Sequence, residues 1–157
     1  MSINFKKLGE TKVTTALMLV NIAVFIIMTL HGGSEDIDNL VRFGAMVKPL
    51  VKLGQWWRIF TAAFIHIGFF HILFNMYFLY SIGPLFEKLY GSRNFLIIYL
   101  LAGIMGNLFT YAFASNNTVS AGASTSLYGI FGLAIGLMIN YRDDDILRGL
   151  GASFLSI

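Results

Sequence analysis

The chain has 157 residues, of which 57% are hydrophobic and 12% are charged, and its mean hydropathy is +0.73. Soluble domains carry about 25% charged residues, so this composition is typical of a membrane protein. The chain contains no cysteine, which excludes disulfides and thiolate metal sites. Its net charge of +3 comes from basic residues beside apolar segments rather than from a basic patch, so no nucleic-acid partner is indicated. One compact membrane domain in a lipid bilayer is expected.

Four apolar runs of roughly bilayer length follow one another along the chain. They cover residues 13–30, 67–86, 94–114 and 124–141. A helix rises about 1.5 Å per residue and needs about 20 residues to cross the hydrocarbon core, so each run predicts a transmembrane helix, the fourth a little short. The predicted fold is all-α: a polytopic membrane helix bundle with four complete transmembrane helices. Residues 31–66 form a long outer loop, and the membrane domain runs from residue 13 to residue 148.

The charges in the connecting segments predict the orientation. Residues 1–12 carry lysines before the first run, which also suits a signal peptide. No A-x-A cleavage site follows, and the run is longer than a usual signal-peptide core, so a retained helix is expected. With the N-terminus inside, seven of the 11 basic residues lie on the inner side and four on the outer side. This bias predicts a multi-pass protein of a bacterial plasma membrane with a cytoplasmic N-terminus.

The last segment, residues 149–157, is apolar or small throughout. Nine helical residues cover roughly 13 Å, which is less than half of a bilayer. We therefore interpret this segment as the start of a fifth span that is cut short. A short interfacial tail is the alternative.

The only histidines are His31, His66 and His71. His71 and Asn75 are four residues apart and therefore share one face of a helix. Polar side chains inside an apolar helix face the protein interior or a water-filled cavity, so this pair indicates either a functional site or interhelical hydrogen bonds. His66 lies about 140° away around the helix, toward the loop. Because neither histidine has a carboxylate or a third ligand nearby, we expect no metal site.

Residues 120–129, "SAGASTSLYG", interrupt the apolar pattern with hydroxyl and small side chains. Ser124 is a candidate nucleophile, because unpaired N–H groups and the positive dipole end at a helix start stabilise an oxyanion. The motif is not the G-x-S-x-G turn, because Ser126 replaces the second glycine and no strand precedes it. The alternative is close helix packing, in which Gly132 and Gly136 form a GxxxG pair. Ala102 and Gly106 offer a matching face in the third run.

Several motifs occur together in a fixed order. They are "WWR" at 56–58, the H-x4-H-x3-N pattern of His66, His71 and Asn75, "GPLFE" at 83–87, "GS" followed by Arg93, and G-A-S-x3-Y-G at 122–129. In this combination the sequence resembles the rhomboid intramembrane serine proteases. The resemblance covers residues 13–141, and the ordered set is specific although each motif alone is weak.

The resemblance implies a helical bundle whose active site opens to water from the outer side and which acts on membrane-protein substrates without a cofactor. Ser124 would attack a peptide bond in or beside a substrate's transmembrane helix. His71, Asn75 and the Ser124 backbone N–H would form the oxyanion hole, and Gly122 precedes the nucleophile. The remaining matches are supporting residues: Tyr128 against the base histidine, Trp57, Arg58 and His66 in the first loop, and Glu87 and Arg93 on the cytoplasmic side.

Two departures from the family pattern affect this interpretation. Thr125 stands where the family has glycine, and its β-branched side chain could crowd the approach of the sixth helix. The family's general base is a histidine on that sixth span, whereas no histidine follows His71 here. A serine hydroxyl is a weak nucleophile without an adjacent base, so this chain alone is not expected to turn over.

Three interpretations follow from these observations. The first is a rhomboid protease whose C-terminal part is missing from this chain, so that an extended gene product would carry a histidine after a completed fifth span. The second is an inactive rhomboid-like protein that binds membrane helices without cutting them. The third is a transporter or channel fragment that binds an anion at the start of its broken helix.

Overall fold

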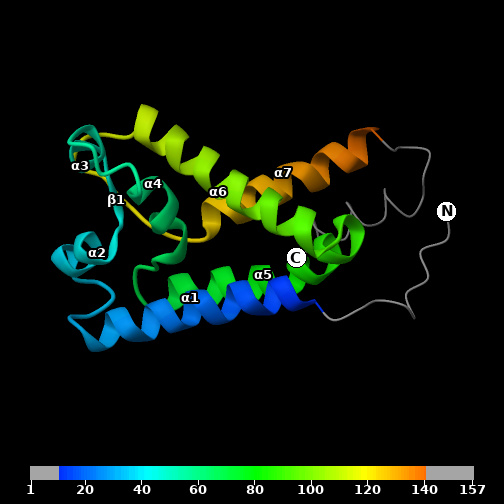
Figure 1. The fold of residues 1–157 in the computed structure, drawn as a ribbon, viewed down its shortest axis with the longest axis horizontal. Coiled ribbons are helices and arrows are strands. Elements are labelled where there is room, and N and C mark those ends of the chain that lie inside the picture. The colour runs from blue at the N-terminus through cyan, green and yellow to red at the C-terminus, as the bar shows by residue number, and fades with distance from the viewer. Residues whose placement is uncertain (1–10, 141–157) are drawn as a thin grey trace.

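The computed structural model describes residues 11–140 of the chain (Figure 1). Its long helices are α1 (Lys12–Leu30), α5 (Phe69–Tyr90), α6 (Ser92–Phe113) and α7 (Ser124–Asn140). Three of them, α1, α5 and α6, are long and apolar enough to cross a membrane, and α7 is a shorter apolar helix of 17 residues. The structure thus supports a helical membrane bundle with three candidate spans. The proposed fifth span at residues 149–157 lies outside the described residues.

Helices α1, α6 and α7 cover nearly the same residues as three of the apolar runs, whereas α5 is shifted toward the C-terminus relative to the run at 67–86. It continues past residue 86 through Glu87 and Lys88 to Tyr90 and ends at Gly91, whose φ is +78°. From the sequence, we ended this predicted helix at residue 86, directly before the first charged residues of the segment. Glu87 is nevertheless buried, because it caps a neighbouring helix.

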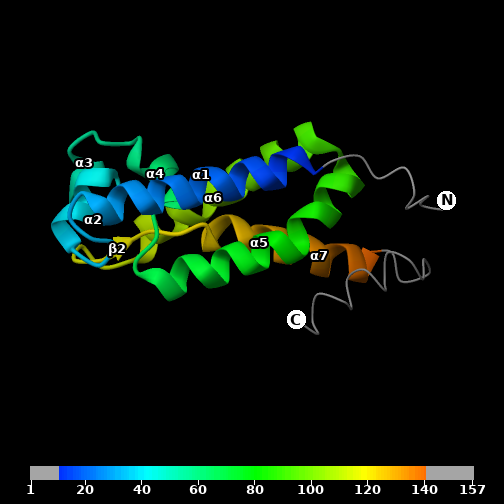
Figure 2. The ribbon, with the colours of Figure 1, turned by 90° about the horizontal axis from the view of Figure 1, so that it is seen from below.

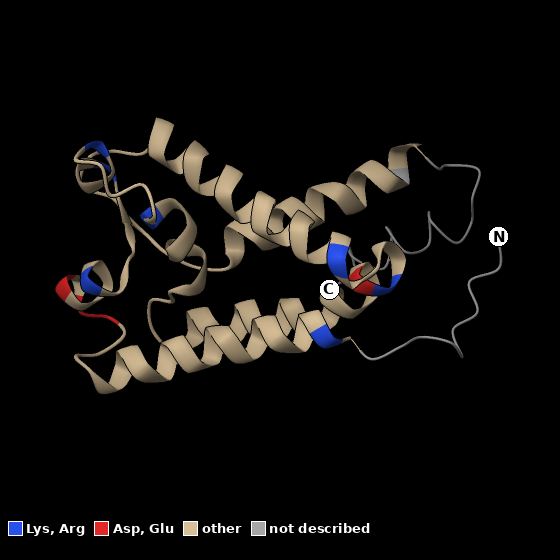
Figure 3. Ribbon diagram, in the orientation of Figure 1, with Lys and Arg blue, Asp and Glu red and all other residues tan. Residues whose placement is uncertain are grey.

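The four long helices form two packed pairs. Helix α1 packs along α5, and α6 crosses α7 at close range (Figures 1 and 2). Charged residues gather at the two ends of the bundle, and the helices between those ends carry none (Figure 3). This separation is what a hydrocarbon layer requires, because a charge at its centre is costly.

The loop predicted at residues 31–66 is highly structured. It contains α2 (Ile37–Phe43), β1 (Met46–Val47), α3 (Lys48–Lys52), α4 (Arg58–Thr61) and the 3-10 helix η2 (Ala62–Phe64). Strand β1 pairs antiparallel with β2 (Val119–Ser120), with Met46 opposite Ser120. The all-α prediction missed this pairing, because two-residue strands give no sequence periodicity. The pairing of β1 with β2 joins the loop to the segment that precedes Ser124.

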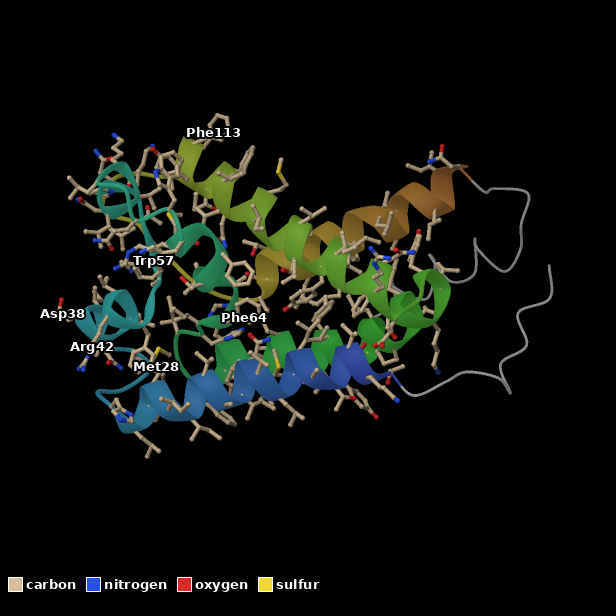
Figure 4. All side chains as sticks on the ribbon, in the orientation of Figure 1. Met28, Asp38, Arg42, Trp57, Phe64 and Phe113 are labelled. Atoms are coloured by element: carbon tan, nitrogen blue, oxygen red, sulfur yellow. The ribbon has the colours of Figure 1, made fainter. Side chains whose placement is uncertain are left out.

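Arg58 organises this loop from a buried position. Its Nη1 donates to the carbonyl oxygens of Val41 at 2.7 Å and Ala45 at 2.9 Å, and its Nε donates to Oε1 of Gln55 at 2.7 Å. Its guanidinium also lies 4.5 Å from the centre of the Trp57 ring. Figure 4 labels Trp57 within the structured loop. One side chain therefore satisfies the carbonyls at the end of α2 and fixes α4 against them.

Glu87 joins three helices at the opposite end of the bundle. Its carboxylate accepts hydrogen bonds from the N–H groups of Val13 at 2.9 Å and Thr14 at 2.8 Å, and from the Thr14 hydroxyl at 2.8 Å. The Ser92 hydroxyl donates to the same carboxylate at 2.7 Å. Because the first N–H groups of a helix have no intrahelical acceptor, a negative side chain from α5 caps α1 and also holds the start of α6.

Helices α6 and α7 approach closely, but the predicted GxxxG pair does not make the contact. A β-carbon at Gly103 would lie 2.5 Å from Ser126 Oγ, and one at Gly106 would lie 2.8 Å from Cβ of Thr125. Gly129 faces Ala102 in the same way, whereas a β-carbon at Gly132 or Gly136 would have no neighbour within 4 Å. The expected packing of α6 on α7 is therefore found at Ala102, Gly106 and Gly129, whereas Gly132 and Gly136 take no part in it among the described residues.

Candidate active site

Ser124 is the first residue of α7, and the loop before it is held from both sides. The Gly122 N–H donates to the Ala62 carbonyl at 2.8 Å, and the Ala123 N–H donates to Nε2 of His66 at 3.2 Å. Both acceptors belong to the short segment that joins α4 to α5. The position of Ser124 is thus set by a part of the chain about sixty residues earlier in the sequence.

His66 is fully buried in this segment, just before α5. Burial and the neighbouring His71 lower the pKa of His66 to about 4, so its imidazole is neutral at physiological pH. Since Nε2 accepts the Ala123 hydrogen bond, the ring proton is assigned to Nδ1. His66 therefore acts as a neutral acceptor that fixes the backbone, which agrees with the loop-side position expected from the sequence.

His71 lies on the first turns of α5, with its ring 5.2 Å from that of His66. Its Nδ1 accepts a hydrogen bond from the Ile67 N–H at 3.3 Å. In the neutral ring this assigns the proton to Nε2. His71 Nε2 is therefore a donor, directed away from the start of α5.

Gly122 lies close to the side chains of both His71 and Ser124. A β-carbon at Gly122 would lie 2.7 Å from Nε2 of His71 and 3.4 Å from Oγ of Ser124. The φ of Gly122 is +127°, a region that side-chain-bearing residues rarely adopt. Glycine is thus required here both by backbone conformation and by the approach of the imidazole.

His71 and Ser124 open onto one apolar cavity of about 410 Å³ between α5 and α7. Each helix contributes a stripe of four lining residues: His71, Phe74, Asn75 and Phe78 from α5, and Ser124, Leu127, Tyr128 and Phe131 from α7. Both stripes follow the spacing i, i+3, i+4, i+7, which defines one helix face. The sequence interpretation identified the polar members and missed the apolar ones, although the same spacing was there to find them.

Asn75 and Tyr128 occupy different positions in this cavity. Asn75 is buried, and its Nδ2 donates to the His71 carbonyl at 2.8 Å, which leaves its second N–H available. Tyr128 is 75% exposed and lies on the open side of the cavity. Thr125 does not face this side, because its β-carbon lies against Gly106 of α6.

The other residues named from the sequence lie away from the cavity. Trp57 and Arg58 belong to the structured loop, Glu87 lies at the opposite end of the bundle, and Arg93 is exposed in the first turn of α6. Among residues 11–140, no three His, Cys, Asp or Glu side chains are grouped so that they could hold a metal ion. Within the described chain, the polar groups that line the cavity are a serine hydroxyl, an imidazole, a carboxamide and the phenol of Tyr128.

The sequence of this chain is similar to those of known proteins over most of its length. Residues 53–152 match the Rhomboid domain. The chain is 36% identical to rhomboid protease GluP of Bacillus subtilis over 149 residues, which cover 95% of the chain and 29% of that protein. It is 33% identical to rhomboid protease AarA of Providencia stuartii over 139 residues, covering 78% of the chain and 50% of AarA.

These relatives are longer than the chain. The aligned part also covers only 47% of the putative rhomboid protease YdcA of Bacillus subtilis, which is 36% identical over 94 residues. The chain therefore spans half or less of each of these proteins. The matched domain nevertheless includes α4 to α7 and all residues that line the cavity. With its three apolar helices of spanning length, this chain is an integral membrane protein that belongs to the rhomboid family of intramembrane proteases.

Proposed function

We propose that this chain provides the nucleophile and the oxyanion hole of a serine endopeptidase that cleaves transmembrane segments of membrane proteins. The observation that carries the proposal is that His71 Nε2 and Ser124 Oγ both lie close to Gly122 and that both residues line one apolar cavity. Rhomboid proteins act on membrane-protein substrates in a lipid bilayer. An apolar cavity with few polar groups suits the unwound end of such a substrate helix.

In the proposed reaction, Ser124 Oγ attacks the carbonyl carbon of the scissile peptide bond. The negative charge that develops on the carbonyl oxygen is stabilised by three donors: the Nε2 proton of His71, the second Nδ2 proton of Asn75 and the Ser124 N–H. Donors that are fixed before the reaction stabilise the oxyanion without reorganisation. The hydroxyl proton of Ser124 must pass to a base, and the amine leaving group must then take up a proton.

We propose that none of the three histidines in the chain is this base. His71 would have to change tautomer and give up its hydrogen bond from the Ile67 N–H. His66 uses Nε2 to accept from Ala123, and His31 is exposed at the end of α1. The base would then be a histidine supplied from outside these 157 residues, as the family pattern implies for a sixth span. The 157-residue chain alone should not turn over.

A reporter assay tests this proposal. A single-span reporter should stay uncleaved by the 157-residue chain and should be cleaved when the chain is extended by a span that carries a histidine. Ser124→Ala in the extended protein should abolish cleavage, whereas Ser81→Ala, on the same bundle, should leave it unchanged. Cleavage that survives Ser124→Ala would exclude Ser124 as the nucleophile.

A serine-directed fluorophosphonate gives a second test of the missing base. It should label the 157-residue chain weakly at Ser124, because the hydroxyl is not activated. Strong labelling of this chain at Ser124 would show that one of the present side chains acts as the base.

An inactive protein that binds membrane helices is the second candidate function. It is favoured by the open apolar side of the cavity, where Tyr128 is 75% exposed. In this case Ser124→Ala should leave the capture of a single-span partner unchanged in a pull-down. Loss of capture would contradict it. The match to the Rhomboid domain argues against the transporter or channel alternative.

We also propose that the protein lies in a bacterial plasma membrane with its N-terminus in the cytoplasm. The support is the excess of basic residues in the segments assigned to the inner side. Protease protection of tags placed at the N-terminus and in the loop at 115–118 would test this orientation.

A further inference from the structure

Three buried polar groups on three different helices have no hydrogen-bond partner among residues 11–140. They are Oδ1 of Asn21 in α1, the hydroxyl of Tyr99 in α6 and the hydroxyl of Ser126 in α7. All three side chains are fully buried. Nearly all buried polar groups in proteins are paired, either with another protein group or with ordered water. These three atoms therefore need a partner that the described side chains do not supply.

The three groups lie close together in the bundle. The Tyr99 hydroxyl lies beside the side chains of both Asn21 and Ser126. Gly103 follows Tyr99 by one turn on the same buried face of α6, and a β-carbon at Gly103 would lie 2.5 Å from Ser126 Oγ. Helix α1 contacts α6, and Leu17, one turn before Asn21, packs in the same core cluster as Tyr99. The three polar atoms thus converge between α1, α6 and α7, but they make no hydrogen bond of ordinary geometry with one another.

Local hydrogen bonds do not use these atoms. Asn21 Nδ2 donates to the Leu17 carbonyl at 2.7 Å, which leaves Oδ1 on the other side of the carboxamide as an acceptor. Helical serines often donate to the carbonyl four residues earlier, as Ser81 does to Tyr77 at 2.8 Å. The Ser126 hydroxyl makes no such bond within the described chain. Both atoms can therefore bind a further group inside the bundle.

The chemistry of the three groups identifies that further group. Asn21 Oδ1 can only accept, whereas the hydroxyls of Tyr99 and Ser126 can each donate or accept. A water molecule offers two protons and two lone pairs, and buried waters typically make about three hydrogen bonds to otherwise unpaired polar groups. None of the three side chains is charged, so an ion bound among them would lack a counter-charge, which makes burial costly. The site therefore suits a neutral molecule of the size of water.

We infer that one ordered water molecule is bound among Asn21, Tyr99 and Ser126. It donates to Asn21 Oδ1, accepts from the Tyr99 hydroxyl and bridges to Ser126 Oγ. The water joins α1 to the packed pair of α6 and α7 in the middle of the bundle, whereas Glu87 joins the helices at one end. Ser126 does not line the cavity at Ser124, and the proposed protease reaction does not depend on this water.

A crystal structure of the 157-residue chain, at a resolution that shows ordered water, tests the site directly. A single density peak should lie within hydrogen-bond distance of Asn21 Oδ1, the Tyr99 hydroxyl and Ser126 Oγ. Direct hydrogen bonds from Tyr99 to Asn21 and Ser126, with no peak between them, would overturn the inference. A peak that touches only one of the three atoms would overturn it as well.

Nuclear magnetic resonance of the chain in detergent gives a second measurement that needs no crystals. The side-chain amide protons of Asn21 should show a nuclear Overhauser contact with long-lived water. Asn107 is an equally buried carboxamide whose Nδ2 donates to the Ile59 carbonyl at 2.8 Å, and it provides the background level. If the signal of Asn21 does not exceed that of Asn107, no water is bound beside Asn21.

Variants separate a bound water from the exchanging phenol proton. Tyr99→Phe leaves the water two partners, so the contact at Asn21 should persist with similar strength, whereas a contact through the phenol would be lost. Adding Ser126→Ala leaves one partner, which is too few to hold a buried water, and should abolish the contact. The matched control, Tyr77→Phe with Ser81→Ala on α5, should leave it unchanged. Loss in Tyr99→Phe alone, or survival in the double variant at the site, would overturn the inference.

Discussion

Nε2 of His66 accepts a hydrogen bond from the N–H of Ala123 at 3.2 Å, across a sequence separation of 57 residues. The bond joins the segment before α5 to the residue immediately before Ser124. It holds only while the ring is neutral at Nε2, because a protonated imidazole has no acceptor. The placement of the candidate nucleophile therefore depends on the protonation state of a buried histidine.

This bond predicts a loss of stability in mild acid. The pKa of His66 is lowered to about 4 in the folded chain and returns to its ordinary value of about 6.5 on unfolding. Below pH 6.5 the unfolded chain takes up the proton first, so the free energy of unfolding falls until about pH 4, by at most about 3 kcal/mol. Unfolding at several pH values in detergent measures this effect. His66→Gln should remove this part of the pH dependence, and an unchanged profile would contradict the prediction.

Gly122→Ala should destabilise the protein by about 2 kcal/mol or more. The new β-carbon would collide with the His71 ring, and alanine is strained at a φ of +127°. Gly132→Ala is the matched control, because no atom of the described residues lies within 4 Å of its added carbon and alanine favours a helix. In denaturant unfolding, Gly122→Ala should be less stable than the parent chain, whereas Gly132→Ala should be equally stable or more stable. Equal losses would show that the contact with His71 is unimportant.

The effect of the same two substitutions can also be measured at position 124, where Ser124 can be replaced by the only cysteine of the chain. Ser124→Cys introduces a single thiol whose reaction rate with a maleimide reports its exposure. Adding Gly122→Ala should change this rate, since the alanine displaces His71 beside the thiol. Adding Gly132→Ala should not. If neither substitution changes the reaction rate, His71 and Ser124 do not both lie beside Gly122.

Glu87→Gln should weaken the joint of α1, α5 and α6. The carboxylate accepts four hydrogen bonds, and an amide offers only one acceptor atom and loses the charge that favours the start of α1. We expect a loss of about 2 kcal/mol in the free energy of unfolding. Glu35→Gln, an exposed change in the loop, should stay within about 0.5 kcal/mol of the parent chain. Similar effects of the two changes would refute a capping role for Glu87.

Arg58→Lys tests the organisation of the loop. Lysine keeps the charge but lacks the planar fork with which Arg58 reaches Val41, Ala45 and Gln55. We expect a loss of about 2 kcal/mol, because the buried Ala45 carbonyl loses its donor and the Val41 carbonyl keeps only its bond from the Gly44 N–H. Thermal unfolding in detergent, compared with Arg42→Lys at an exposed site, measures it. If both substitutions lower the midpoint temperature of unfolding equally, the hydrogen bonds of Arg58 do not stabilise the loop.

Features that depend on local spacing could be predicted from the amino-acid sequence. Long apolar runs predicted the membrane helices, and the spacing of His71 and Asn75 placed them on one helix face. The position of Ser124 at the start of α7 followed from the pattern around it. Such features depend on helix periodicity and on the cost of polar groups in hydrocarbon. Both can be recognised within a single segment of the sequence.

The contacts between groups far apart in the sequence could not be predicted in this way. The bond from Ala123 to His66, the approach of His71 to Gly122, the pairing of β1 with β2 and the capping of α1 by Glu87 each join segments far apart in the chain. No local pattern encodes such partners, because they depend on how the helices pack. For the same reason a β-carbon at Gly132 or Gly136, which match a packing motif by spacing, would meet no atom within 4 Å among residues 11–140, while Gly103, Gly106 and Gly129 make the close contacts of α6 and α7.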